Sequence, residues 1–321
     1  MTVTSSSRPK ESIALLFPGQ GSQYPGMGAD LARESTTARQ LMERADDVLR
    51  YSLSKIMLED RKEELDRTIN TQPAVFVHSM ALLELMRERC PLTPVIAAGH
   101  SLGEYSALCA AGVLNFDDAL KIIQARARGM DQAQPAGTCG MAALLGLTKD
   151  EALKIIESNR GDDVLEAANF NAPDQVVVSG HLSAVGRVIE AAKERDRARG
   201  VKLPVSSAFH TCLMEPAKKT LTEELGIVAL KSCQFTVVAN VTGQPYPTSA
   251  GGGKDLMIEQ VVNPVLWVDC VQAMLKSGTS LFVEVGPGKV LTGLLRRIDR
   301  KARAMSISDM YGISAFEGVM L

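Results

Sequence analysis

A serine flanked by two glycines, at the end of an apolar run, constrains the fold of this chain more than any other feature. The pentapeptide GHSLG at 99–103 follows the apolar segment 94–99, a predicted strand, and precedes a helical pattern. Glycines two residues on either side let a strand and a helix approach closely, with Ser101 at the apex of a strained turn. The start of the following helix then supplies free N–H groups and the positive end of its dipole. On this stretch alone, Ser101 is either an exposed nucleophile or a small residue in a packed turn.

Short apolar strands alternate with helical patterns along the chain, which is typical of an α/β fold. Between 138 and 206 the expected order is β-α-β-β-α-β, the ferredoxin-like pattern. We therefore predict a hydrolase-like α/β core with a central, mostly parallel sheet and an inserted ferredoxin-like subdomain. Pro73 is expected in the first turn of its helix, a position that tolerates proline. The core strands are expected at 12–17, 94–99, 235–241 and 281–286, and the main helices at 36–49, 73–89, 116–133 and 286–304.

The same pattern divides the chain into four parts. We expect a flexible N-terminus at 1–11, a large core formed by 12–137 and 207–308, the ferredoxin-like subdomain at 138–206 and a C-terminal tail at 309–321. Because the two core segments flank the subdomain, it is predicted to be an insertion within the core.

Composition and charge limit the partners and the compartment. The net charge is −2, so no overall field favours nucleic acid or a membrane surface. No apolar run approaches the roughly 18 residues that a membrane span needs, and the first residues lack the apolar core of a secretory signal. The six cysteines are spaced without CxxC, which fits reduced thiols rather than a zinc site. We expect a cytoplasmic monomer; the serine-rich, lightly basic first residues leave an organelle-targeted precursor as the minor alternative.

Only four histidines are available to activate a serine hydroxyl, which is a poor nucleophile without a base. His78 lies inside an apolar helix and is expected in the core, and His181 stands at a helix start, where capping explains it. His100 adjoins Ser101 but points away from it, so we expect it at the mouth of the site. His210 follows a strand and precedes a helix, where α/β proteins place catalytic residues, and we take it as the base. No acidic residue stands clearly at the end of a main-sheet strand between the two, which counts against a generic esterase.

Five ordered motifs resemble one known family, the malonyl-CoA:acyl carrier protein transacylases. The acyltransferase domains of polyketide and fatty acid synthases share these motifs, and the resemblance extends from about residue 12 to residue 308. The motifs are FPGQGSQYPGMG at 17–28, GHSLGEYSAL at 99–108, AFHTCLMEPA at 208–217, NPVLW at 263–267 and FVEVGPGKVLTGL at 282–294.

The resemblance implies roles for particular residues. Ser101 would be the nucleophile that becomes the acyl ester, and His210 its general acid and base. The backbone N–H groups of Gln20 and Leu102 would form the oxyanion hole, where each donor is typically worth about 3 kcal/mol of transition-state stabilisation. The main-chain carbonyl of Gln260 would orient the histidine, which would explain the missing acid.

Malonyl-specific members of the family carry an arginine that binds the free carboxylate, and counting back from the motif PAGT places it at Arg126. Arg126 and Arg128 are about 200° apart on a helix, so only one can face a cleft, and the apolar neighbours favour Arg126. A carboxylate can accept both arms of a guanidinium, whereas an acetyl group would leave Arg126 unpaired. A surface role for Arg126 stays open from its pattern alone. Phe209, the residue before the histidine, is similar to the residue at this place in malonyl-using members of the family. It would fill the space that a branched α-carbon needs.

The activity implied by the resemblance is malonyl transfer for fatty acid biosynthesis. The malonyl group would pass from malonyl-CoA to Ser101 and then to the phosphopantetheine thiol of an acyl carrier protein, in a ping-pong sequence without a metal or redox cofactor. Carrier proteins are acidic, so the basic stretch 294–303 and Lys218 with Lys219 are candidate docking residues. A solvated helix face explains these charges equally well.

Three alternatives remain at this point. A thioester hydrolase would use the same site, and it differs in whether water or a thiol takes the acyl group. A non-catalytic subunit that binds carrier proteins would be expected to lack Ser101 or His210, and both are present. A domain of a multidomain synthase is disfavoured by the length of 321 residues and the self-contained ends.

Overall fold

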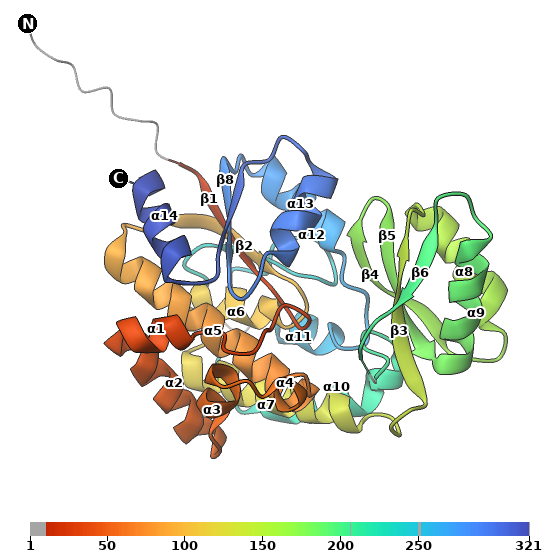
Figure 1. The fold of residues 1–321 in the computed structure, drawn as a ribbon, viewed down its shortest axis with the longest axis horizontal. Coiled ribbons are helices and arrows are strands. Elements are labelled where there is room, and N and C mark those ends of the chain that lie inside the picture. Colours follow the sequence, from red (N-terminus) through yellow and green to blue (C-terminus); the bar gives the residue numbers. More distant parts are fainter. Residues whose placement is uncertain (1–10, 206, 250–251, 321) are drawn as a thin grey trace, which may run out of the picture.

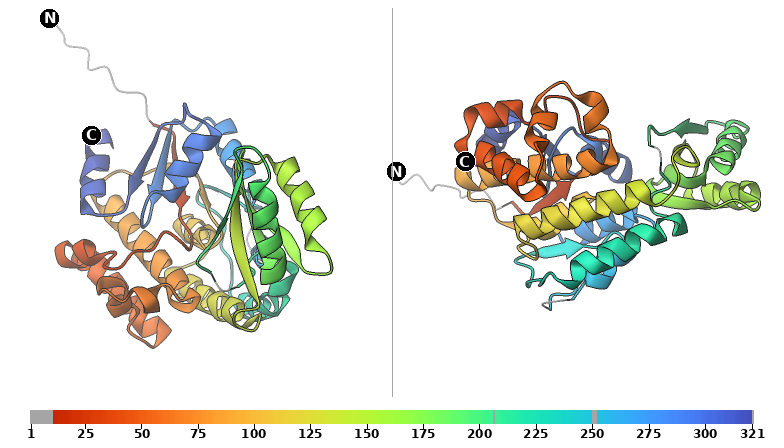
Figure 2. Two further views of the ribbon diagram at one scale, coloured as in Figure 1. Left: turned by 45° about the vertical axis from the view of Figure 1, so that its right-hand side comes forward. Right: turned by 90° about the horizontal axis from the view of Figure 1, so that it is seen from below.

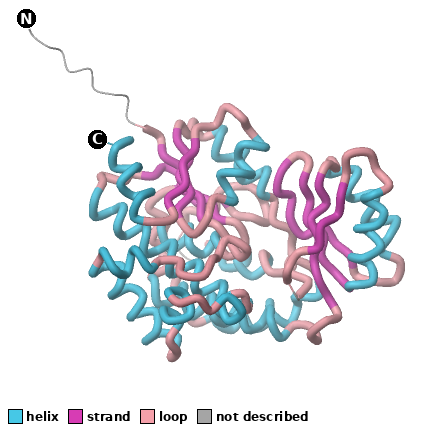
Figure 3. Tube along the Cα trace, viewed as in Figure 1, coloured by secondary structure: helices cyan, strands magenta, loops and turns pink. Residues whose placement is uncertain are grey.

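The computed structural model describes residues 11–205, 207–249 and 252–320, and these residues form two units with separate β-sheets (Figure 1, Figure 3). The larger unit has a five-stranded sheet, and the smaller has a four-stranded sheet. Apart from Glu11, the N-terminus predicted to be flexible lies outside the described residues.

The five-stranded sheet places the ends of several loops together. All of its neighbouring strands are parallel, and the central strand is completely buried, as expected when helices cover both faces. Because parallel strands end at the same edge, the loops that follow them meet there. The prediction of a central parallel sheet is therefore confirmed. In spatial order the strands are β7 (Thr236–Val238), β2 (Pro94–Gly99), β1 (Ile13–Phe17), β8 (Leu281–Val285) and β9 (Ala304–Ile307).

The helix α5 (Thr68–Arg89) packs against several other helices of the larger unit. It is apolar on nearly every face and is buried along most of its length. It begins at Thr68 rather than at 73, so the prediction that Pro73 lies in the first turn was wrong; the polar run TINTQ conceals the true start. The other helices of the larger unit are α1 (Ala29–Glu34), α2 (Thr36–Leu49), α3 (Leu53–Leu58), α4 (Lys62–Leu65), α6 (Gly103–Ala110), α7 (Phe116–Gln132), α10 (Glu215–Gly226), α11 (Lys254–Glu259), α12 (Trp267–Lys276), α13 (Val290–Ile298) and α14 (Met310–Met320).

The C-terminal region differs from the expectation. The helix predicted at 286–304 ends at Ile298, and the edge strand β9 follows it. β9 has only four residues and pairs with β8 alone, so its apolar pattern is too short to predict. Within the predicted C-terminal tail, Met310–Met320 form α14, in which Ile313 and Phe316 are completely buried.

The smaller unit is a four-stranded antiparallel sheet with two helices on its outer face (Figure 2). Its strand order, β4-β5-β3-β6, and its βαββαβ connectivity confirm the predicted ferredoxin-like subdomain. Alternate residues of the strands face opposite ways: Ala142 and Val178 pack in the subdomain's own core, and Ala143 and Val177 face the larger unit. The elements are β3 (Cys139–Leu145), α8 (Lys149–Arg160), β4 (Leu165–Ala172), β5 (Gln175–His181), α9 (Leu182–Lys193) and β6 (Arg199–Lys202).

His78 lies in α5 and is fully buried, as expected of a core histidine. Within the described residues neither of its ring nitrogens has a hydrogen-bond partner. Burial lowers the pKa of His78 to about 4, although Asp30 and Asp309 raise it. The neutral imidazole is therefore the form that the folded protein holds.

This depressed pKa makes stability depend on pH. In the unfolded chain His78 takes up a proton near its ordinary pKa of 6.5, so the folded state loses stability as pH falls from 6.5 towards 4. We expect the loss of unfolding free energy between pH 7.5 and pH 5 to be smaller by about 2 kcal/mol in His78→Leu than in the wild type. Urea unfolding of both proteins at the two pH values measures this difference, and identical pH dependences would contradict the assignment.

Candidate active site

Ser101 forms the turn between β2 and α6, with a left-handed φ of 51°. The two glycines of GHSLG are required by space. A Cβ on Gly99 would lie 1.9 Å from the backbone of Gly103, and a Cβ on Gly103 would lie 2.0 Å from the carbonyl oxygen of Phe17. The strand, the turn and the helix therefore pack as closely as the pentapeptide predicted.

His210 and Ser101 are brought together from distant parts of the chain. The Nε2 atom of His210 lies 2.7 Å from Ser101 Oγ. Its Nδ1 atom lies 2.8 Å from the carbonyl oxygen of Gln260 and 3.2 Å from that of Asn263. Nδ1 therefore carries the proton and donates it to these carbonyls, and Nε2 is left as an acceptor towards the hydroxyl.

The surroundings of His210 keep the imidazole neutral. Its side chain is 3% exposed. Burial and the charge of Arg126 lower the pKa of His210 to about 3, and the carbonyl of Gln260 raises it. Over the described residues no carboxylate contacts the ring, so backbone oxygens alone orient it.

Arg126 is 1% exposed and contacts neutral oxygens. One terminal nitrogen donates to Gln72 Oε1 at 2.7 Å, and the other donates to Ser101 Oγ at 2.9 Å and to Gln260 Oε1 at 3.0 Å. Within the described ranges, no carboxylate lies within ion-pair distance, and the Nε atom has no hydrogen-bond partner. Burial lowers the pKa of this guanidinium. Arg128, by contrast, is exposed.

The loop after β1 packs against the Ser101 turn. A Cβ on Gly19 would lie 2.4 Å from the carbonyl oxygen of His100 and 3.8 Å from the backbone nitrogen of Leu102, so glycine is needed for the approach. The N–H groups of Gln20 and Leu102 donate to no residue in the part of the chain that the structure describes. Two free backbone donors are therefore available on segments that meet beside Ser101.

A cleft of about 460 Å³ opens between the two units next to this turn. His100 lines it, and its Nε2 atom lies 2.7 Å from Asn171 Oδ1, which places this histidine at the mouth of the site as expected. Phe209 is 7% exposed and packs in the main core instead. Further lining residues include Gln20, Gly21, Gln23, Asn169, Gln175, Leu203, Pro204, Leu291 and Leu294.

His181 does not serve as the helix cap that the sequence suggested. It is the N-cap residue of α9, but its side chain makes no capping hydrogen bond. Its Nδ1 atom instead accepts the N–H of Val164 at 3.2 Å and lies 3.1 Å from Asp163. The ring therefore bonds the residues that precede β4 at the end of β5, rather than capping a helix.

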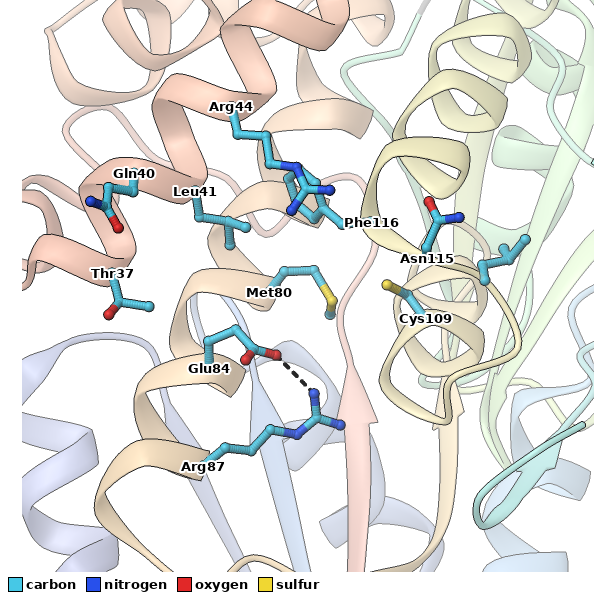
Figure 4. Close-up of a pocket in the computed structure, with 11 residues that line it drawn as sticks. Thr37, Gln40, Leu41, Arg44, Met80, Glu84, Arg87, Cys109, Asn115 and Phe116 are labelled. Atoms are coloured by element: carbon cyan, nitrogen blue, oxygen red, sulfur yellow. Dashed lines mark hydrogen bonds and ion pairs between the residues drawn. The ribbon is translucent and has the colours of Figure 1, made fainter. Parts of the chain in front are cut away.

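A second pocket, of about 440 Å³, lies between α2, α5 and the residues that join α6 to α7 (Figure 4). It contains two arginines that already have carboxylate partners. Arg87 lies 2.8 Å from Glu84, and Arg44 lies 2.7 Å from Asp117. Arg126 is therefore the better candidate to bind the carboxylate of a ligand.

Sequence analysis missed the amide side chains around Ser101. Gln72 and the side chain of Gln260 hold Arg126, and Asn240 accepts the N–H of Ser101 at 2.7 Å. Gln72 lies in the polar start of an otherwise apolar helix, and Asn240 follows the strand β7 at the edge where such sites form. These positions were the only indications in the sequence that the two amides belong to the site.

The described residues contain neither a metal-binding cluster nor a membrane-spanning helix. No group of three or more histidine, cysteine, aspartate or glutamate side chains is arranged to hold a metal ion in the described ranges. Among the helices described, none combines the length and the apolarity needed to cross a membrane.

Comparison with known proteins first gives the class. A sequence model of the Acyl transferase domain family matches residues 14–313, which is nearly all of the chain. The chain is thus an acyltransferase, a class of enzyme that the α/β fold and the paired serine and histidine fit.

Individual relatives define the family more narrowly. The malonyl CoA-acyl carrier protein transacylase of Bacillus subtilis is 40% identical over 92% of this chain and 93% of its own length. The corresponding structure from Coxiella burnetii is 34% identical, with a TM-score of 0.93 over 97% of this chain and 98% of that one. A structure of a type II PKS acyl-carrier protein in complex with its malonyl-transacylase is 36% identical, with a TM-score of 0.92 over 96% and 99% of the two chains. This chain belongs to the malonyl-CoA:acyl carrier protein transacylase family, and the resemblance seen in its motifs is confirmed.

Proposed function

We propose that this protein transfers the malonyl group from malonyl-CoA to the phosphopantetheine thiol of an acyl carrier protein, and that it thereby supplies fatty acid biosynthesis. One observation carries the proposal: Ser101 Oγ lies within hydrogen-bond distance of both His210 and the buried Arg126. A nucleophile, its base and a cation without a carboxylate partner thus surround one point. The names of the relatives agree with this reaction.

In the first step, Ser101 Oγ attacks the thioester carbonyl carbon and gives its proton to His210 Nε2. The negative charge that develops on the carbonyl oxygen is stabilised by the N–H groups of Gln20 and Leu102. The carbon–sulfur bond then breaks, and coenzyme A leaves with the proton from His210. The product is a malonyl ester of Ser101.

In the second step, the carrier protein's thiol gives its proton to His210 and attacks the ester. The same N–H groups stabilise the second oxyanion. The carbon–oxygen bond breaks, and Ser101 Oγ regains a proton from His210. Serine, histidine and backbone donors supply every group that these steps use, so we propose that no metal or redox cofactor takes part.

Arg126 selects the acyl group in this proposal. Its terminal nitrogens, which donate to neutral amide and hydroxyl oxygens, can instead form a bidentate, charge-assisted pair with the malonyl carboxylate. That pair also offsets the positive charge that lowers the pKa of His210. We propose that Phe209, which precedes His210 in the sequence, limits branching at the α-carbon of the acyl group.

Ion pairs reduce the set of basic residues that are available to bind the carrier protein. Arg297 lies 2.6 Å from Asp174, and Lys218 lies 2.8 Å from Glu259, so neither is free for an acidic partner. Other exposed basic residues follow the cleft-lining part of α13, and none of them pairs with a carboxylate in the described ranges: Arg296, Arg300 and Lys301. Lys219 is also exposed and pairs with no carboxylate in those ranges. We propose these four residues as the docking residues. The six free cysteines agree with action in the cytoplasm.

The test is transfer of labelled malonate from malonyl-CoA to a phosphopantetheinylated acyl carrier protein, followed by mass spectrometry. We expect stoichiometric malonyl-carrier protein, with acetyl-CoA a far poorer donor. The control is carrier protein without its phosphopantetheine, which should remain unmodified. Release of free malonate without carrier-protein labelling would instead establish the thioester hydrolase.

A further inference from the structure

A buried carboxylate lies one turn beyond the nucleophile, and the reaction steps above do not use it. Glu104 is in the first turn of α6 and is 1% exposed. Its Oε2 atom accepts the backbone N–H of Asn240 at 2.6 Å, and its Oε1 atom accepts the Tyr246 hydroxyl at 2.5 Å. The carboxylate thus fixes the loop after β7 against the start of α6.

Asn240 continues this connection to the nucleophile. Its Oδ1 atom accepts the N–H of Ser101 at 2.7 Å, and its Nδ2 atom donates to the carbonyl oxygen of Gly99 at 2.8 Å. The residue is completely buried. One side chain therefore spans the last residue of β2 and the turn that follows it.

The Ser101 backbone needs such support. A left-handed φ is unfavourable for a residue other than glycine, and it persists only where the surroundings enforce it. Asn240 satisfies the Ser101 N–H, and Gln260 Nε2 donates to the Ser101 carbonyl oxygen at 2.8 Å. Because the Ser101 N–H already donates to Asn240, the N–H of Leu102 is the free backbone donor of this turn.

We propose that Glu104 and Asn240 are positioning residues, and that Glu104 acts through Asn240 to hold the Ser101 nucleophile and the Leu102 N–H in place. This inference rests on the proposed acyl transfer at Ser101. A carboxylate suits position 104 because it accepts at both oxygens and brings no competing donor.

The groups around Glu104 oppose the effect of burial on its pKa. Burial raises the pKa of Glu104 to about 7, while the donors Tyr246, Asn240 and Gln260 and the charge of Arg126 lower it. Two of these donors belong to the loop after β7, so the same bonds that hold the carboxylate charge also hold the loop.

A double-mutant cycle on kcat tests the connection. We expect Glu104→Ala and Asn240→Ala each to lower kcat about 100-fold with KM for malonyl-CoA within about 2-fold, because small displacements of a nucleophile cost this much. The double variant should be no slower than Asn240→Ala alone, since the two residues act as one unit. Glu104→Gln should restore kcat to within about 3-fold, because its amide oxygen still accepts the Asn240 N–H.

A second readout does not depend on the malonyl chemistry. The rate at which neutral phenylmethanesulfonyl fluoride modifies Ser101 should fall in parallel with kcat in these variants. Failure of the wild type to malonylate a carrier protein would refute the proposed function, whereas this rate still reports the positioning. Asp46→Ala is the matched control, since Asp46 also accepts one backbone N–H and one hydroxyl, both from Ser54, away from the site. It should leave both rates unchanged.

The proposal is overturned if the Glu104→Ala and Asn240→Ala losses multiply in the double variant, if KM rises in place of the fall in kcat, or if Glu104→Gln is as slow as Glu104→Ala. If Glu104→Ala does not fold, Tyr246→Phe takes its place in the cycle. It removes the donor to Oε1 of Glu104, the oxygen that does not accept the Asn240 N–H. We expect about a 5-fold fall in kcat, absent from the Asn240→Ala background; an equal fall in that background overturns the proposal.

Discussion

Ser101→Ala should abolish the retention of radiolabelled malonate on the protein after denaturation and lower kcat for malonyl transfer by at least about 10⁴-fold. The hydroxyl lies 2.7 Å from His210 Nε2, so its loss removes the atom that would carry the acyl group. The oxyanion donors and Arg126 would remain, but without a covalent intermediate they cannot link the two half-reactions. Incubation with labelled malonyl-CoA, denaturation and counting of the bound label measure the effect.

Ser106→Ala is the control for this substitution. Ser106 is buried further along α6, and its hydroxyl has no hydrogen-bond partner within the described residues. Removing a buried, unpaired hydroxyl should leave labelling and kcat near the wild-type values. Undiminished labelling of Ser101→Ala would refute the nucleophile assignment.

Arg126→Ala should lower kcat/KM for malonyl-CoA by about 10²- to 10³-fold, while acetyl transfer holds or rises. The expected loss corresponds to about 3–4 kcal/mol, the scale of truncating one partner of a buried charge pair. Acetyl groups have no carboxylate, so they lose nothing when the guanidinium is removed. Steady-state kinetics with malonyl-CoA and with acetyl-CoA give the ratio of the two kcat/KM values, which tests this prediction.

Arg128→Ala distinguishes the loss of a contact in the pocket from a general effect on the helix α7. It lies on the same helix as Arg126 but is exposed, and its removal should leave both activities unchanged. Arg126→Lys should recover part of the malonyl activity, because a lysine offers charge without the planar, two-pronged geometry. Equal losses of malonyl and acetyl transfer in Arg126→Ala would refute a role in carboxylate binding.

The elements that the sequence predicted well are those with a strong local pattern. The helix expected at 36–49 forms α2 over those residues, and the strand expected at 94–99 forms β2. The predictions failed where a tertiary contact replaced a local signal. β9 is stabilised by pairing with β8, and the polar start of α5 is buried by its neighbours.

The candidate site divides in the same way. The prediction of Ser101 rests on a strained turn that requires glycines at fixed spacing, and the prediction of His210 rests on the small number of histidines. The roles of the remaining residues came from family resemblance. The structure places these residues around the Ser101 turn: Arg126, Gln20, Leu102 and Gln260.

The sequence by itself determined the parallel-sheet core, the ferredoxin-like subdomain, the turn at Ser101 and the family. These depend on spacing along the chain, which motifs and periodicity record directly. Only the tertiary structure decided which partners hold those residues, since the Asn240 contact with Ser101 joins positions 139 residues apart. Amide side chains such as Asn240 and Gln72 have no periodic pattern. The role of Asn240 follows from the edge of the parallel sheet where separate loops meet, and that of Gln72 from the packing of α5 beside Arg126.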